Sequence, residues 1–111
     1  MSTSPIDMAV YNDLADTAGA EFAAELAATF LEEAPPILAE LRAALGAQAA
    51  DGFRRAAHSL KSNGHTFGAT RLAEMARELE LGGLPADSAP IDALEAEYRT
   101  LAAALAELIR G

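Results

Sequence analysis

Apolar residues recur every three or four positions along most of this chain, a spacing typical of amphipathic helices. The clearest run lies near the C-terminus, where steps of three and four alternate through Ile91, Leu94, Tyr98, Leu101, Leu105 and Leu108. A loop over residues 84–88 precedes this run. We expect Ser88 to cap the helix, with Pro90 in its first turn, because serine and proline favour those positions.

A second apolar seam predicts a helix in the middle of the chain, with Asp51 as its N-cap. The seam is made by Phe53, Ala57, Leu60, Gly64 and Phe67. Glycine in a helix interior costs about 1 kcal/mol relative to alanine, so Gly64 indicates close approach of a neighbouring helix. The next helix is expected to begin at Thr66 or Gly68 and to end at Gly82-Gly83, with Leu72, Met75, Ala76 and Leu79 facing inward.

Two more helices are predicted before residue 47. The first is short, over about residues 5–17, with Ser4 at its N-cap and Pro5 at its first position. Its apolar face would lie across the other helices as a lid. The second runs from about Ala20 to Gly46, and its buried face is expected to include Phe22, Leu26 and Phe30.

The pair Pro35-Pro36 interrupts this second helix, because proline removes a backbone donor and clashes with the preceding turn. The helix either kinks there or ends, with a new helix starting at the proline. We favour a kink, because the apolar register continues through Leu31, Leu38, Leu41 and Leu45.

Four long helices with short connections, each with one apolar stripe, predict an all-α fold. We expect an antiparallel four-helix bundle with an additional short N-terminal helix, as a single domain over residues 1–111. There is no cysteine, which excludes disulfides and thiolate metal sites. Neither a transmembrane run nor a signal peptide is recognisable, so the expected location is the cytoplasm. Met1 and the full set of helices favour a free-standing protein over a domain excised from a longer chain.

The charge is unevenly distributed. The net charge of −9 argues against nucleic-acid binding, which needs a basic surface. Residues 52–73 nevertheless hold four basic side chains and no acidic one: Arg54, Arg55, Lys61 and Arg71. This local excess either attracts a small anion or an acidic partner, or is a chance cluster on a solvated face.

The chemistry of the 53–67 helix lies on a polar stripe formed by Arg54, His58, Lys61 and His65, on a different face from the seam. An exposed imidazole on a rigid helix is a nucleophile at neutral pH. Lys61 follows His58 by one turn, about 5–6 Å away at Cβ, and can stabilise the oxygens of a phosphoryl group. Ser62 can donate a hydrogen bond to such an oxygen. No carboxylate in the stretch can orient the imidazole as in a catalytic triad.

Taken alone, His-x-x-Lys on a helix is a weak signal, and several interpretations compete with phosphoryl acceptance. A metal site that uses His58 and His65 is disfavoured, since chelation from adjacent turns prefers a spacing of three or four residues. A helical protein-interaction module without phosphorylation is the main alternative. The dimerisation part of a sensor kinase would need a dimerising hairpin and an ATP-binding domain.

The sequence around His58 resembles the histidine-containing phosphotransfer (HPt) domain family. The segments that carry the resemblance are 57–64 (Ala-His-Ser-Leu-Lys-Ser-Asn-Gly), Phe67-Gly68-Ala69, Arg71-Leu72-Ala73 and Leu79-Glu80. The family pattern has leucine and lysine two and three positions after the histidine, glycine or serine at the fourth, a small residue at the sixth, an apolar residue at the ninth and glycine at the tenth. Every position is met, and the earlier apolar residues also lie where the first two helices of the family carry them.

The resemblance implies a monomeric bundle whose His58 accepts a phosphoryl group at Nε2 from a receiver-domain aspartate and passes it to another receiver. It makes Lys61 the supporting cation and Gly68 the glycine that keeps the surface near the histidine open, with Ser62 and Gly64 in supporting positions. The implied partners are response-regulator receiver domains and a hybrid histidine kinase, with neither nucleic acid nor membrane. No ATP site or cofactor is implied, and Mg²⁺ is expected on the receiver.

His65 falls where the family pattern places no fixed residue. It is either a solvated residue at the helix end, or a second phosphate contact or modulator of the His58 pKa, and it lacks a lysine three residues later. Arg54 and His65 are therefore named as candidate partner contacts.

Overall fold

The structure is a computed structural model that describes residues 5–110. Within these residues the chain forms five α-helices: α1 (Met8–Ala18), α2 (Ala20–Gly46), α3 (Ala50–Phe67), α4 (Thr70–Gly82) and α5 (Ala89–Arg110). The predicted all-α fold, a four-helix bundle with a short N-terminal helix, is confirmed. None of the helices over 5–110 combines the length and apolar character needed to cross a membrane.

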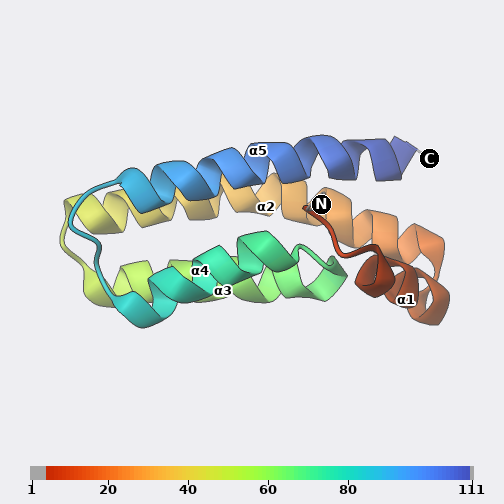
Figure 1. Ribbon diagram of the computed structural model, residues 1–111, viewed down its shortest axis with the longest axis horizontal. Coiled ribbons are helices and arrows are strands. Elements are labelled where there is room, and N and C mark those ends of the chain that lie inside the picture. Colours follow the sequence, from red (N-terminus) through yellow and green to blue (C-terminus); the bar gives the residue numbers. More distant parts are fainter. Residues whose placement is uncertain (1–4, 111) are drawn as a thin grey trace, which may run out of the picture.

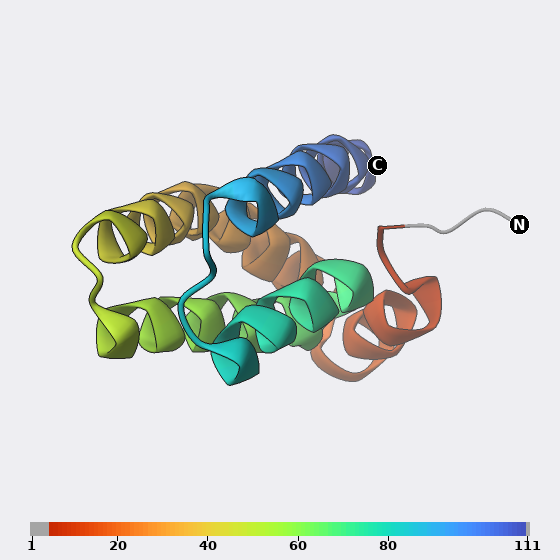
Figure 2. The ribbon, with the colours of Figure 1, turned by 60° about the vertical axis from the view of Figure 1, so that its left-hand side comes forward.

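Helices α2 to α5 form the bundle, and α1 lies at one end of it (Figure 1). α3 packs against α2 and α4, and α5 packs against the same two helices. In the described chain α3 and α5 therefore lie at opposite corners of the bundle. Figure 2, an oblique view, shows α3 and α4 below α2 and α5. The loop between α4 and α5 connects the two helices at the end of the bundle away from α1 (Figure 1).

The core is entirely apolar, and the predicted seams supply most of it. The largest fully buried side chains come from all four bundle helices: Leu41, Phe53, Leu60, Phe67, Leu72, Ile91, Leu94, Leu101 and Leu105. The seam of α3 is buried throughout, which fixes the rotation of that helix and turns its polar stripe outward. Phe22 is an exception among the predicted core residues, because it is 46 % exposed near the corner between α1 and α2.

α2 continues through Pro35 and Pro36 as one helix, so the helix does not end there. A proline at 35 leaves the Leu31 carbonyl without its helical donor. The Tyr98 hydroxyl of α5 takes the vacant place and donates to the Leu31 oxygen at 3.1 Å. Another helix therefore completes the hydrogen bonding that the proline interrupts.

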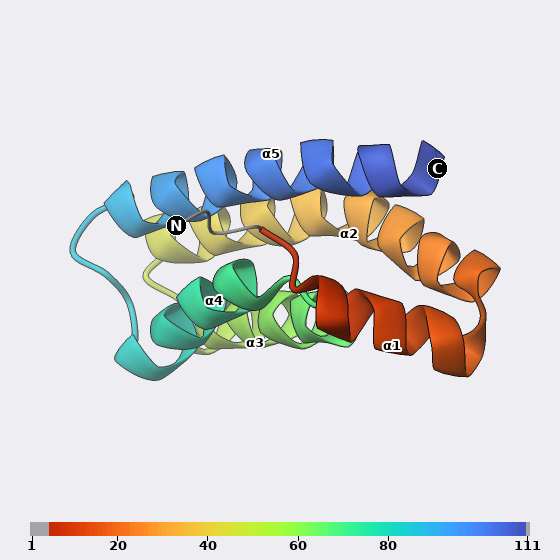
Figure 3. The same ribbon diagram turned by 45° about the vertical axis from the view of Figure 1, so that its right-hand side comes forward.

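α1 packs against α2 and the end of α3 (Figure 3). The Asp7 N–H donates to the Gly68 carbonyl at 2.6 Å, and Ile6 is buried beside this contact. Helix α1 therefore begins later than expected, at Met8, with the Asp7 carboxylate accepting from the Ala9 N–H. Ser4, the predicted cap, lies outside the described residues, and Pro5 precedes the helix.

Two other predicted boundaries were wrong by two to four residues. Asp51 lies inside the first turn of α3, whose N-cap is Ala49. α4 begins at Thr70 after Ala69, because α3 continues through Thr66 to Phe67. The predicted start of α5 is correct, since Ser88 directly precedes the helix and its carbonyl accepts from the Asp92 N–H, although the side-chain acceptor for the Ala89 N–H is the Asp87 carboxylate. Short polar residues next to each other compete for a cap, and sequence alone does not rank them.

Candidate functional site

The polar stripe of α3 is exposed, because burial of the apolar seam turns the opposite face of the helix outward. The His58 side chain is 56 % exposed, whereas Ala57 and Leu60 on the other face are buried. Lys61 is less open, at 22 % of its side-chain surface. An exposed imidazole thus projects from a helix that is anchored by its apolar face, and its ring is accessible to a large partner.

A carboxylate from α4 joins His58 and Lys61. Glu80 Oε2 lies 2.8 Å from His58 Nδ1, and Glu80 Oε1 lies 2.7 Å from Lys61 Nζ. The carboxylate is only 14 % exposed, so water screens these contacts weakly. One glutamate therefore holds both the candidate nucleophile and the candidate cation in place.

The ionisation of Glu80 follows from this arrangement. Lys61 and, to a lesser extent, His58 hold the pKa of the Glu80 carboxyl below its ordinary value, and they outweigh burial, which raises it. Oε1 is buried and has no hydrogen bond of good geometry in the described structure, so its contact with Lys61 is chiefly ionic. Glu80 is thus a carboxylate at neutral pH.

This carboxylate decides which nitrogen of His58 can react. An ionised carboxylate only accepts hydrogen bonds, so Nδ1 carries the proton and donates it toward Oε2. In the neutral ring the lone pair is then on Nε2, on the far side from Glu80. Nε2 is the nitrogen that is free to attack an electrophile.

Glu80 was missed as a site residue by the sequence reasoning, although Leu79-Glu80 belongs to the segments that carry the family resemblance. It lies 22 residues after His58, and only the packing of α4 on α3 brings the two together. A signal was available. Glu80 directly follows the predicted inward residue Leu79, in a helix next to a stretch that has basic but no acidic side chains.

The other polar candidates lie on the same exposed face without joining this cluster. Arg54 is half-exposed and pairs with Asp51 one turn earlier, at 3.7 Å. His65 is exposed in the last turn of α3 and makes no ion pair or side-chain hydrogen bond within residues 5–110. Ser62 is exposed beside His58, and its carbonyl accepts from the Thr66 hydroxyl.

The two glycines have structural reasons of their own. A Cβ at Gly64 would lie 3.4 Å from the Ala69 oxygen and from Leu72 Cδ2, so the predicted close approach of the next helix is confirmed. Gly68 ends α3 with φ +95°, a conformation that favours glycine. A Cβ there would lie 2.6 Å from the Asp7 oxygen. The space beside Gly68 is filled by the start of α1, a different reason from the open surface that we expected.

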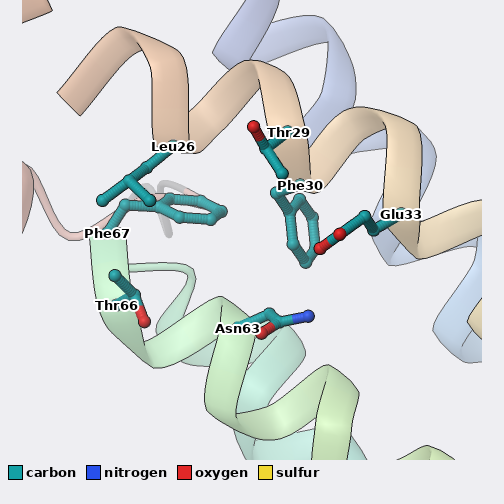
Figure 4. A pocket seen from close by; sticks show the side chains of 7 residues that line it. All are labelled: Leu26, Thr29, Phe30, Glu33, Asn63, Thr66 and Phe67. Carbon is teal, nitrogen blue, oxygen red and sulfur yellow. The ribbon is translucent and has the colours of Figure 1, made fainter. Parts of the chain in front are cut away.

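The flank of His58 that faces α2 is hollowed. An open hollow of about 630 Å³ has His58 at its edge and is lined by Glu32, Glu33, Pro36 and Ile37 of α2 and by Ser59 and Ser62 of α3. A smaller cavity of about 70 Å³ adjoins it, where Phe30 and Phe67 pack edge to face. Glu33 and Asn63 line both spaces, and Figure 4 shows them reaching into the gap between α2 and α3.

The arrangement can perform nucleophilic transfer of an anionic group. It offers Nε2 on an exposed ring, a neighbouring ammonium and a mostly buried carboxylate that can balance a positive charge on the ring. Within the described chain, three or more His, Cys, Asp or Glu side chains nowhere gather as metal ligands would.

Comparison with known proteins gives one match. Residues 25–104 match the family model described as Hpt domain, which covers α3, α4 and most of α2 and α5. No curated protein and no solved structure matches the chain.

Proposed function

The chain belongs to the Hpt domain family, and from this premise we propose that it carries a phosphoryl group on His58 between receiver domains. Hpt domains act as phosphorelay carriers in two-component signalling. The finer proposal names the acceptor atom, His58 Nε2, and the residues that assist it. The observation that carries it is the contact between His58 Nδ1 and Glu80, because that contact leaves Nε2 unprotonated on an exposed ring.

The proposed step is a direct transfer. The Nε2 lone pair attacks phosphorus, the bond from phosphorus to the receiver's aspartyl oxygen breaks, and the aspartate leaves as a carboxylate. The imidazole ring becomes positively charged and keeps its Nδ1 proton, which Glu80 accepts as a hydrogen bond. A buried carboxylate in this position stabilises the imidazolium, as in other sites that use histidine. The reverse step returns the phosphoryl group to a second aspartate.

Lys61 would place positive charge beside the phosphoryl oxygens during this transfer. Its ammonium is bound to Glu80 in the structure, so the carboxylate sets its position relative to the ring. Ser62 would donate to a phosphoryl oxygen from the next turn. We propose no cofactor on this chain and expect Mg²⁺ on the receiver. The relay would run from a hybrid histidine kinase to response regulators, in the cytoplasm, with the carrier as a monomer.

The test is intact mass after the protein is mixed with phosphorylated receiver domains. Wild type should gain one phosphate that is lost in acid and kept in base. His58→Gln should gain none and stay folded by circular dichroism, because the side chain is exposed. His65→Gln is the matched control, since it removes the other exposed histidine of the same helix and should leave phosphorylation intact.

Phosphate on His58→Gln, or its loss from His65→Gln, would contradict the assignment of the acceptor. A folded wild type that accepts nothing from a broad set of receivers would instead favour the alternative, a helical interaction module with the same fold and no phosphorylation.

A further inference from the structure

The hollow between α2 and α3 continues from His58 over the surface of α2. Any receiver that brings its aspartate to Nε2 must also cover this neighbouring surface. Apart from His58 and Ser62, which border the hollow, its side chains are not those that assist the phosphoryl group, because Lys61 and Glu80 lie on the flank that faces α4. The hollow is therefore a contact surface with its own chemistry.

That chemistry is dominated by acceptors. Glu32 and Glu33 are exposed, and the ion pairs of residues 5–110 involve other carboxylates. None of the residues that line the hollow is a lysine or arginine. Arg55 is one turn before Ser59 on α3 and is not part of the lining. The hollow thus has two carboxylates without a cation to pair with.

A third acceptor comes from the double proline. Pro36 has no N–H, so the Glu32 carbonyl lacks its helical donor. At the preceding position the Tyr98 hydroxyl replaces the missing donor, but no side chain of the described residues does so for Glu32. Residues 32 and 36 share a face of α2 and both line the hollow, so the gap that Pro36 leaves in the helical hydrogen bonding is at the residues that also supply the carboxylates.

The remaining lining suits the stem of a long side chain. Pro36 and Ile37 provide an apolar wall, and Ser59, Ser62 and Asn63 provide polar groups on the opposite side. Lysine and arginine combine an apolar stem with a charged head that only donates hydrogen bonds. Their chemistry matches an apolar wall beside three free acceptors.

We propose that this hollow binds a lysine or arginine side chain of the receiver domain, and that Glu32 and Glu33 thereby select which receivers exchange phosphate with His58. The inference rests on the proposed function and adds the chemistry of the partner. It also orients the partner, because the aspartyl phosphate approaches over Lys61 while the cationic side chain enters beside α2.

The first test compares two variants with the same net charge, Glu32→Lys/Glu33→Lys and Glu21→Lys/Glu25→Lys. All four glutamates are exposed on α2, and only the first pair lines the hollow. The substrate is the phosphorylated receiver that transfers fastest to wild type. We expect the hollow variant to raise KM about tenfold and kcat to change less than twofold, because charges at an interface act mainly on association. The control variant should raise KM less than twofold.

Salt provides a second readout of the same pair. Raising the salt concentration should increase the KM of wild type and of the control variant, because it screens the attraction between the receiver and the hollow. The hollow variant should lose this dependence. A merely structural defect would not remove it.

The open carbonyl is tested by Pro36→Ala, which restores a backbone donor to Glu32. The matched control is Pro35→Ala, whose restored donor faces the Leu31 carbonyl on the Tyr98 side. We expect Pro36→Ala to raise KM about fivefold, the effect of one hydrogen bond, and Pro35→Ala to leave KM unchanged.

The outcomes separate this inference from the proposed function. If wild type is phosphorylated normally and the hollow variant keeps its KM and salt dependence, the selection by Glu32 and Glu33 is overturned and the carrier function stands. Equal loss in the hollow and control variants would also overturn it, because overall charge would then explain the effect. If folded wild type accepts no phosphate from any receiver, the carrier function fails and the inference fails with it.

Discussion

At the scale of single residues, Glu80 decides the chemistry of the site. It binds His58 and Lys61 through different oxygens, at 2.8 and 2.7 Å, from a helix that neither of them belongs to. Its negative charge determines the tautomer of the ring and the position of the ammonium. The histidine and lysine can be recognised from their spacing, whereas this third member depends on how α4 packs on α3.

We expect Glu80→Gln to slow phosphorylation of His58 about 10- to 100-fold, the effect of losing one charge-assisted hydrogen bond in the transition state. The amide is neutral and cannot stabilise an imidazolium as a carboxylate does. The measurement is the limiting rate of a single turnover with saturating phosphorylated receiver. The carrier mechanism places the loss in this rate and not in the affinity for the receiver.

Glu78→Gln is the control, since Glu78 is exposed on the same helix and makes no ion pair in the described chain. The folded pKa of Glu80 is held below the ordinary 4.5, so the carboxylate persists at neutral pH and is lost only as the pH falls below that value. An unchanged single-turnover rate in Glu80→Gln would remove Glu80 from the mechanism.

At the scale of elements, α2 shows how a helix passes through two prolines. Each proline leaves one carbonyl without a donor, and the two carbonyls differ in their surroundings. The Leu31 carbonyl faces α5 and accepts from the Tyr98 hydroxyl, whose pKa is raised above its ordinary value of 10 by burial. Pro36 leaves the Glu32 carbonyl without its helical donor, and both residues line the hollow. The two prolines therefore have different consequences. One missing donor is replaced by a hydrogen bond between α5 and α2, and the other is not replaced by any side chain of the described residues.

This hydrogen bond between α5 and α2 predicts a coupling between two positions 63 residues apart. Tyr98→Phe should lower the free energy of unfolding by about 1 kcal/mol, because it leaves the Leu31 carbonyl without a donor. In the Pro35→Ala background the same change should cost less, since the restored N–H satisfies that carbonyl. Urea unfolding of the four proteins of this double-mutant cycle measures the coupling.

Tyr11→Phe serves as the comparison, because Tyr11 is buried and its hydroxyl makes no hydrogen bond in the described chain. It should lower stability less than Tyr98→Phe does. Equal costs of Tyr98→Phe in both backgrounds would show that the hydroxyl does not replace the helical donor.

At the scale of the whole molecule, the start of α1 is attached to the bundle at Gly68. Asp7 and Val10 occupy the space where a Cβ would be, and the Asp7 N–H binds the Gly68 carbonyl. The turn that ends α3 is thus also the docking point of the N-terminal helix. This links the position of α1 to the helix that carries His58.

Gly68→Ala should destabilise the protein by more than the backbone cost of its conformation, which is about 1–2 kcal/mol. The added methyl group would collide with the Asp7 carbonyl and displace α1. Gly83→Ala isolates the backbone cost, since Gly83 also has a positive φ of 77° and a Cβ there meets nothing within 4 Å. Hydrogen exchange should show faster exchange of α1 in Gly68→Ala alone, and equal exchange in both variants would contradict the docking role.

The sequence by itself determined the class of fold and the face of each bundle helix. Apolar residues at steps of three and four leave a helix one way to bury its surface, so the seam from Phe53 to Phe67 predicted that His58 and Lys61 would point outward. The same apolar spacing predicted that α2 continues through Pro35 and Pro36. The spacing of apolar residues can be read within each helix separately, without knowing which other helices it contacts.

Only the tertiary structure decided the contacts between helices. It placed Glu80 against His58, the Tyr98 hydroxyl on the Leu31 carbonyl and Asp7 over Gly68. It also left Phe22 exposed, because an apolar position is buried only where a neighbouring helix covers it. These outcomes depend on which surfaces meet after the helices pack, and residues 22 or 67 positions apart carry no local signal of meeting.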